Sequence, residues 1–218
     1  MKAGFSIWNL FTLLLMLLPS LYLFYTWPSL PAHVPTHFDI GGNANGYTNK
    51  ESMWLLCTLL PLSIYLLLWF TPRFDPKRRL NAGSANYQKL ILALMGLLSG
   101  LLVYSLYLAV HPQERAGQGM AILMGLFFML IGNYLTTVPP NYFMGFKTPW
   151  ALEFPLIWAR VHRVGGWLFC ITGLLSALLA VVWSAPVATG VLIAGVLATV
   201  VVVYGYSYYL YQQVSKAA

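Results

Sequence analysis

Residues 90–110 read LILALMGLLSGLLVYSLYLAV and contain no Asp, Glu, Lys, Arg or His. A helix of about 20 predominantly apolar residues is long enough to cross about 30 Å of hydrocarbon. In lipid an α-helix satisfies its own backbone hydrogen bonds, whereas a membrane β-strand would alternate apolar and polar residues. The stretch therefore predicts a transmembrane helix.

Five more uncharged apolar runs lie on either side of this one. The full set of predicted spans is 5–25, 52–71, 90–110, 120–138, 164–183 and 187–209. Of the 218 residues, 59% are hydrophobic and only 8% are charged, whereas soluble domains carry about 25% charged residues. These observations exclude a soluble globule and predict an all-α polytopic membrane protein with six transmembrane helices.

The positions of the basic residues predict the orientation. If six helices alternate sides, ten of the 12 Lys and Arg residues fall on the side of both termini, and only Lys50 and Arg115 fall on the other. By the positive-inside rule, the N- and C-termini are then cytoplasmic. The net charge of +7 lies in short loops beside lipid headgroups, so we expect the bilayer rather than nucleic acid as the direct partner.

The spacing of the runs predicts two regions. Residues 1–88 form a two-helix hairpin with a structured outer loop at 27–51, and residues 89–218 form a four-helix region with an inner interfacial helix at 148–163. Glycines at 96, 100, 125, 132 and 173 predict close helix contacts. Gly96 and Gly100 can serve either an internal contact or a homo-oligomer.

The outer loop, 27–51, reads WPSLPAHVPTHFDIGGNANGYTNKE. Its three prolines favour an extended entry, and the Gly- and Asn-rich half favours tight turns. We therefore expect a shaped polar hairpin.

Two histidines and one aspartate in this loop leave three chemical interpretations open. Asp39 can cap a turn while His33 and His37 bond within the loop, the loop can recognise a peptide or another ligand, or His37 and Asp39 can hold a divalent metal. No other cofactor is expected. The candidate binding residues of the outer loop are His33, Pro35, His37, Phe38, Asp39, Asn43, Tyr47 and Lys50.

The inner loop, 139–163, reads PPNYFMGFKTPWALEFPLIWARVHR. Thr148 followed by Pro149 predicts an N-cap and a first helical turn. Trp150 and Trp158 fall on one stripe of that helix, which predicts an interfacial helix with its Trp side toward the acyl chains, ending at a turn at 165–166. The helix can be a membrane anchor or a cytoplasmic docking surface.

Asn133 lies near the end of the fourth span and has two interpretations. It can make a hydrogen bond between helices, or it can line an inner polar pocket with Asn141, Lys147 and His162. The candidate inner-face residues are Asn133, Asn141, Lys147, Trp150, Trp158, His162 and Arg163.

Two stretches resemble a known family. Residues 140–152, PNYFMGFKTPWAL, with Gly132-Asn133 before them and Trp158 and His162-Arg163 after them, resemble the signature of the SdpI-type immunity family. Residues 34–39, VPTHFD, with Gly46-Tyr47, resemble the domain of unknown function that often precedes that signature. The resemblance implies a small bacterial membrane protein that protects its cell from a secreted toxic peptide. It also implies, for some members, a signalling role in which a transcriptional repressor is captured at the inner face.

The sequence thus predicts an immunity protein of the bacterial cytoplasmic membrane that binds a secreted toxic peptide at its outer loop. A peptide or small-molecule transporter is the alternative, although the spans carry no ionisable residue at mid-membrane. A membrane-embedded metalloenzyme is a further alternative. We expect no catalytic residues, because no nucleophile stands beside a base.

Overall fold

The computed structural model describes residues 6–77 and 79–217. Three residues used in the predictions lie outside these ranges. Phe5 was the first residue of the first predicted span, and Lys2 and Arg78 were counted among the basic residues on the side of the termini. Within the described ranges, six helices are long and apolar enough to cross a membrane, which confirms the all-α polytopic prediction. They are Ile7–Ser29, Lys50–Phe74, Ala85–Val110, Gly117–Leu135, Pro155–Val182 and Ala185–Lys216.

In the described residues, the bundle consists of seven α-helices and a β-hairpin. The helices are α1 (Ile7–Thr26), α2 (Leu60–Phe74), α3 (Ala85–Val110), α4 (Gly117–Leu135), α5 (Pro149–Glu153), α6 (Pro155–Val182) and α7 (Ala185–Ala217). A 3₁₀ turn extends α1 over Trp27–Ser29, and a 3₁₀ turn at Lys50–Ser52 and a π-helical segment at Leu55–Leu59 lead into α2. The strands are β1 (His33–Phe38) and β2 (Ala44–Asn49).

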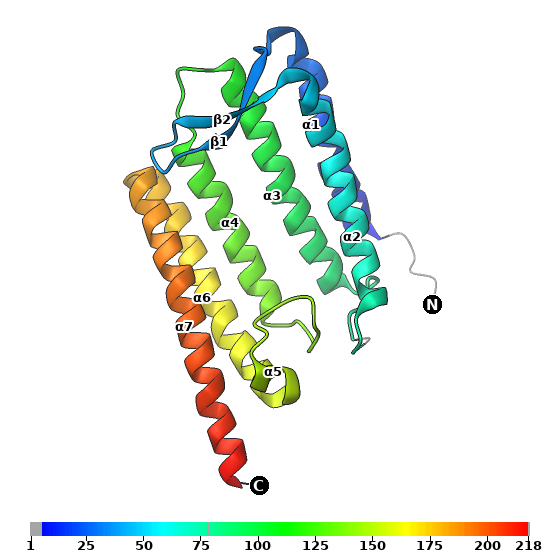
Figure 1. The fold of residues 1–218 in the computed structure, drawn as a ribbon, viewed down its shortest axis with the longest axis vertical. Helices are drawn as coiled ribbons and strands as arrows, with labels where there is room; N and C mark the ends of the chain where they lie inside the picture. The colour runs from blue at the N-terminus through cyan, green and yellow to red at the C-terminus, as the bar shows by residue number, and fades with distance from the viewer. Residues whose placement is uncertain (1–5, 78, 218) are drawn as a thin grey trace.

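Helix α3 lies between α1 and α4, and α6 and α7 continue the bundle beyond α4 (Figure 1). The predicted division between residues 88 and 89 falls inside α3, which packs along α1. The Ser99 hydroxyl donates a hydrogen bond to the Leu15 carbonyl oxygen at 2.7 Å. The third span therefore packs with the N-terminal helices, and the predicted boundary does not separate two packing units.

Helices α4 and α6 approach each other through glycine. A Cβ atom built on Gly132 would lie 2.5 Å from the Gly166 carbonyl oxygen, and one on Gly125 would lie 2.6 Å from the Gly173 carbonyl oxygen. Any larger residue at these positions would push the two backbones apart. This contact confirms the predicted close approach at 125, 132 and 173 and fixes the end of α4 next to the first half of α6.

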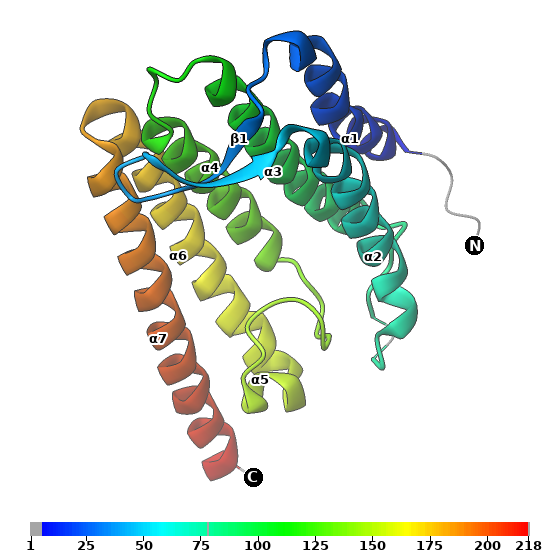
Figure 2. The ribbon, with the colours of Figure 1, turned by 45° about the horizontal axis from the view of Figure 1, so that its top comes forward.

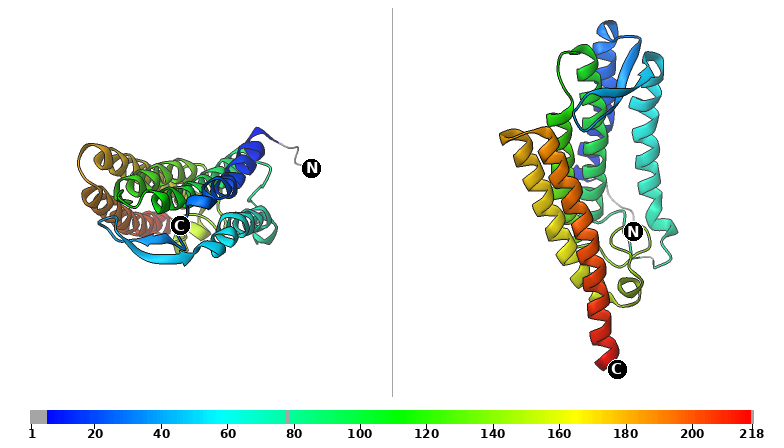
Figure 3. Two further views of the ribbon diagram at one scale, coloured as in Figure 1. Left: turned by 90° about the horizontal axis from the view of Figure 1, so that it is seen from above. Right: turned by 60° about the vertical axis from the view of Figure 1, so that its left-hand side comes forward.

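The outer loop folds into the expected hairpin, and the two antiparallel strands lie across one end of the bundle (Figures 2 and 3). The Ala116 N–H donates to the Gly42 carbonyl oxygen at 3.0 Å, and the Ser105 hydroxyl donates to the carbonyl oxygen of Pro35. Val34 is fully buried in an apolar cluster with side chains of α1, α3 and the start of the second span. The hairpin is therefore fixed to the top of α3 and α4.

The predicted interfacial helix at 148–163 is wrong as one element. Helix α5 ends at Glu153, Phe154 is extended with φ −110° and ψ 108°, and α6 runs without interruption from Pro155 through 165–166. The residue before a proline disfavours the α conformation, so Pro155 separates the two helices. Trp158 is only 1% exposed, so it faces the protein core and not the acyl chains.

The predicted orientation can be tested with two exposed positions at opposite ends of the bundle. In a background with Cys57 and Cys170 replaced by Ala, Asn49→Cys will react with a membrane-impermeant maleimide in intact cells, because we expect the hairpin outside. Lys147→Cys will react only after permeabilisation. Labelling of Lys147→Cys alone in intact cells would show the opposite orientation and contradict the prediction.

Gly42 tests the docking of the hairpin. Its φ is +79°, and a Cβ atom there would lie 2.3 Å from the Gly117 nitrogen. We expect Gly42→Ala to lower the free energy of unfolding by about 1–3 kcal/mol, from backbone strain and steric overlap. Thermal unfolding in detergent measures this. Gly190→Ala is the matched control, because nothing lies within 4 Å of its added Cβ, and an equal loss in both variants would contradict the assignment.

Candidate functional site

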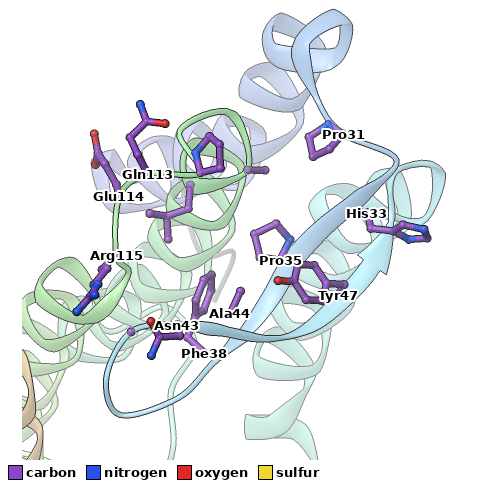
Figure 4. A pocket seen from close by; sticks show the side chains of 14 residues that line it. Pro31, His33, Pro35, Phe38, Asn43, Ala44, Tyr47, Gln113, Glu114 and Arg115 are labelled. Carbon is purple, nitrogen blue, oxygen red and sulfur yellow. The ribbon is translucent and has the colours of Figure 1, made fainter.

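A pocket of about 400 Å³ lies between the β-hairpin and the loop that joins α3 to α4 (Figure 4). The hairpin contributes Phe38 and Tyr47, and the facing loop contributes Glu114 and Arg115. Its volume is in the range of small-ligand and side-chain binding sites, about 300–1,000 Å³. The pocket therefore combines an aromatic wall with one carboxylate and one guanidinium group. The remaining lining residues are Pro31, His33, Pro35, Gly42, Asn43, Ala44, Leu108, Ala109, Pro112 and Gln113.

Stacked rings at the end of α3 position the second wall of this pocket. The rings of Tyr107 and His111 stack with centroids 4.2 Å apart, and the Tyr107 hydroxyl donates to Glu114 Oε1 at 2.8 Å. His111 Nδ1 lies 2.9 Å from the Tyr107 carbonyl oxygen, which accepts its proton. This wall was not predicted from the sequence. The sequence does carry a signal for it, because Tyr107 and His111 are aromatic residues one helical turn apart, directly before the short polar loop.

The structure brings five of the eight outer-loop candidates together in the pocket: His33, Pro35, Phe38, Asn43 and Tyr47. The other three lie elsewhere. His37 and Asp39 line a second groove, of about 590 Å³, between the hairpin tip and α3, α4 and α7. Lys50 Nζ donates to the Leu30 carbonyl oxygen at 3.2 Å and lies 4.6 Å from the centre of the Trp27 ring, so this cation stabilises the entry to the hairpin.

The Asp39 carboxylate is used inside the hairpin turn. Its Oδ1 accepts the Asn43 N–H at 2.8 Å, and its Oδ2 accepts from the Asn43 side chain at 3.1 Å. These hydrogen bonds, the backbone one first, lower the pKa of Asp39. Among the residues that the structure describes, no group of three His, Cys, Asp or Glu side chains is arranged to hold a metal ion. The geometry favours the turn-capping interpretation of Asp39.

At the opposite end of the bundle, Asn141 organises the loop between α4 and α5. Asn141 is fully buried, and its Oδ1 accepts the N–H groups of Phe143 at 2.8 Å and Met144 at 2.7 Å. Its Nδ2 donates to the carbonyl oxygens of Pro139 at 2.8 Å and Met144 at 3.1 Å. One side chain thus satisfies four backbone groups of the loop.

His162 fixes the same loop to α6. Its Nε2 accepts the Phe146 N–H at 2.9 Å, so its Nδ1 carries the proton and donates to the Trp158 carbonyl oxygen, also at 2.9 Å. The Trp158 ring stacks on the imidazole at 3.9 Å. Gly145 has φ +106°, and a Cβ there would lie 2.2 Å from Nε2. Both nitrogens of His162 are therefore engaged in structural hydrogen bonds.

The seven inner-face candidates do not form one site. Asn133 is exposed on the far side of α4, where it faces α1 and α3, so its predicted grouping with Asn141 and His162 is wrong. Trp150 packs on Tyr208 of α7, with ring centroids 5.1 Å apart. Lys147 and Arg163 are exposed. Among the seven, Asn141, Trp158 and His162 are buried, and each makes a hydrogen bond to the backbone between residues 138 and 146.

The fold and these two ends define a class: a multi-pass, six-helix membrane protein with a docked β-hairpin at one end and a hydrogen-bonded loop at the other. The model of the SdpI/YfhL protein family matches residues 137–207, and the model of a domain of unknown function, DUF1648, matches residues 14–60. These matches confirm the predicted resemblance to the SdpI-type family. The chain is also 24% identical over 172 residues to Immunity protein SdpI of Bacillus subtilis (strain 168), covering 78% of this chain and 80% of that protein. No solved structure matches the chain significantly.

Asn141→Ala tests whether the loop between α4 and α5 depends on this side chain. The substitution leaves buried backbone groups without partners, so we expect the free energy of unfolding to fall by about 2–4 kcal/mol. Thermal unfolding in detergent gives the shift. Lys147→Ala is the control, because its side chain is exposed and makes one hydrogen bond at 3.3 Å, to the Tyr142 carbonyl oxygen. Equal stability of Asn141→Ala and wild type would contradict the role given to Asn141.

Proposed function

We propose that the chain is an immunity protein of the bacterial cytoplasmic membrane, and that it binds a secreted toxic peptide in the pocket between the hairpin and the α3–α4 loop. The observation that carries the proposal is that the β-hairpin and the α3–α4 loop, which are far apart in the sequence, together line one amphipathic pocket. The similarity to a protein named for immunity supports the same function.

The chemistry of the pocket suits a membrane-active peptide. Such a peptide carries apolar side chains, and Phe38 and Tyr47 offer aromatic surface for one of them. Glu114 offers a carboxylate to a cationic group of the peptide, and Arg115 offers donors to its backbone or C-terminal carboxylate. A peptide held here lies against the outer surface of the protein and is withheld from the bilayer.

The proposal includes the signalling role that the family resemblance implies. In that role, peptide binding outside changes the affinity of the inner face for a cytoplasmic transcriptional repressor. A surface available for such a partner is the outward side of the Asn141-organised loop. There Tyr142, Phe143 and Lys147 are exposed on a backbone that is fixed from within.

A survival assay tests the function. A toxin-sensitive bacterium that expresses the wild-type chain will survive at least one secreted antimicrobial peptide that kills the empty-vector strain. The Tyr47→Ala/Glu114→Gln double variant will lose that protection, because removal of an aromatic anchor and a charge costs about 2 kcal/mol or more, or about 30-fold in affinity.

The control is Asn49→Ala, which changes an exposed β2 residue outside both the pocket and the second groove. It will protect like wild type at the same membrane level. His37→Ala tells the two hairpin faces apart, because His37 lines only the second groove. Full protection by the double variant, with loss in His37→Ala, would move recognition to that groove. Absence of protection by a correctly inserted wild type would refute the immunity function.

A further inference from the structure

A further amphipathic cavity, distinct from the pocket and the groove beside the hairpin, lies at the opposite end of the bundle. It has a volume of about 420 Å³ and opens between α1, α3 and α4. Asn86 and Lys89 come from the first turns of α3, and Asn133 comes from the last turn of α4, so the polar groups gather at the inner end. Deeper in the bundle, the walls are apolar, with Leu15, Leu92 and Leu130.

The polar mouth of this cavity is arranged for an anion. Lys89 Nζ lies 5.2 Å from the centre of the Trp8 ring, which positions the ammonium group beside the mouth. Helix α3 begins there. Ser84 is its N-cap, and the Ser84 hydroxyl oxygen accepts the Tyr87 N–H at 3.3 Å. The positive end of the helix dipole therefore also lies at the mouth of the cavity. None of the described residues that line the cavity is Asp or Glu.

The two halves of the cavity match the two halves of a phospholipid. The ammonium group of Lys89 and the amides of Asn86 and Asn133 can donate hydrogen bonds to a phosphate. The leucine-lined part continues along the helices, in the direction in which an acyl chain runs. A soluble phosphate would use only the polar mouth and would leave the apolar groove empty.

We propose that this groove is a binding site for one anionic phospholipid, with its headgroup phosphate at Lys89 and an acyl chain along Leu92 and Leu130. The site is separate from the outer pocket, and its occupancy does not depend on the immunity function. It also gives Asn133 a role that fits its observed position on the α1- and α3-facing side of α4.

The test uses the purified full chain in a neutral detergent. Phosphatidylglycerol and phosphatidylcholine with identical acyl chains are titrated, and native mass spectrometry counts bound lipid while thermal unfolding follows stability. We expect one phosphatidylglycerol retained per chain, with stabilisation that phosphatidylcholine and inorganic phosphate do not reproduce. Lys89→Gln will weaken phosphatidylglycerol binding about fivefold, the effect of one basic residue at a membrane surface.

Arg163→Gln is the matched control, because it removes an exposed inner cation that does not line the groove, and it will bind like wild type. Leu130→Trp leaves the charge in place and fills the apolar part, so it will also weaken phosphatidylglycerol binding. Equal binding of phosphatidylcholine, or unchanged binding in both Lys89→Gln and Leu130→Trp, would overturn the proposal. Stabilisation by inorganic phosphate equal to that by phosphatidylglycerol would make the site a phosphate site and not a lipid site.

Discussion

A polar group that is removed from water must find a partner inside the protein, and this constraint governs the connections between the helices. The spans satisfy their backbones internally, but a loop that packs against them does not. At the end of the bundle away from the hairpin, Asn141 supplies both donors and acceptors to its own loop, and His162 supplies one acceptor from α6. Every buried side-chain nitrogen or oxygen in the described ranges has a hydrogen-bond partner. Asn141 and His162 thus make the hydrogen bonds that water would otherwise make to this loop, which allows the loop to be buried.

The close contact of α4 and α6 determines where that loop can lie. Gly132 and Gly166 bring the two backbones together, so the chain leaves α4 close to α6. Phe146 then fills the space beside Gly165, where a Cβ would lie 2.3 Å from its ring. The Trp158 indole N–H donates to the Val138 carbonyl oxygen at 2.9 Å and ties the start of the loop to the same helix. Glycines, aromatic rings and polar side chains of this region therefore form one packing unit.

The spans and the hairpin could be predicted because their determinants are local. A transmembrane helix needs only length and apolarity, and the hairpin needs only its prolines, glycines and Asn43. The interfacial helix failed because an aromatic stripe looks the same whether it faces lipid or protein, and Trp158 faces protein. The second wall of the pocket was missed because the placement of Glu114 opposite the hairpin depends on how the hairpin docks. For the same reason, no periodicity could tell on which side of α4 Asn133 would lie.

Tyr47 and Glu114, which line the pocket beside the β-hairpin, are not among the residues that dock the hairpin on the bundle. Tyr47 is 60% exposed, and the Glu114 carboxylate accepts a hydrogen bond from the Tyr107 hydroxyl of α3. Neither side chain fills the core, so the chemistry of the outer pocket can change without loss of the docking made by Gly42 and Val34. Asn141 and His162 have no such freedom, because each is buried and satisfies backbone groups of the loop. A pocket whose lining side chains are free to vary therefore lies at one end of the bundle, and a loop fixed by buried hydrogen bonds lies at the other.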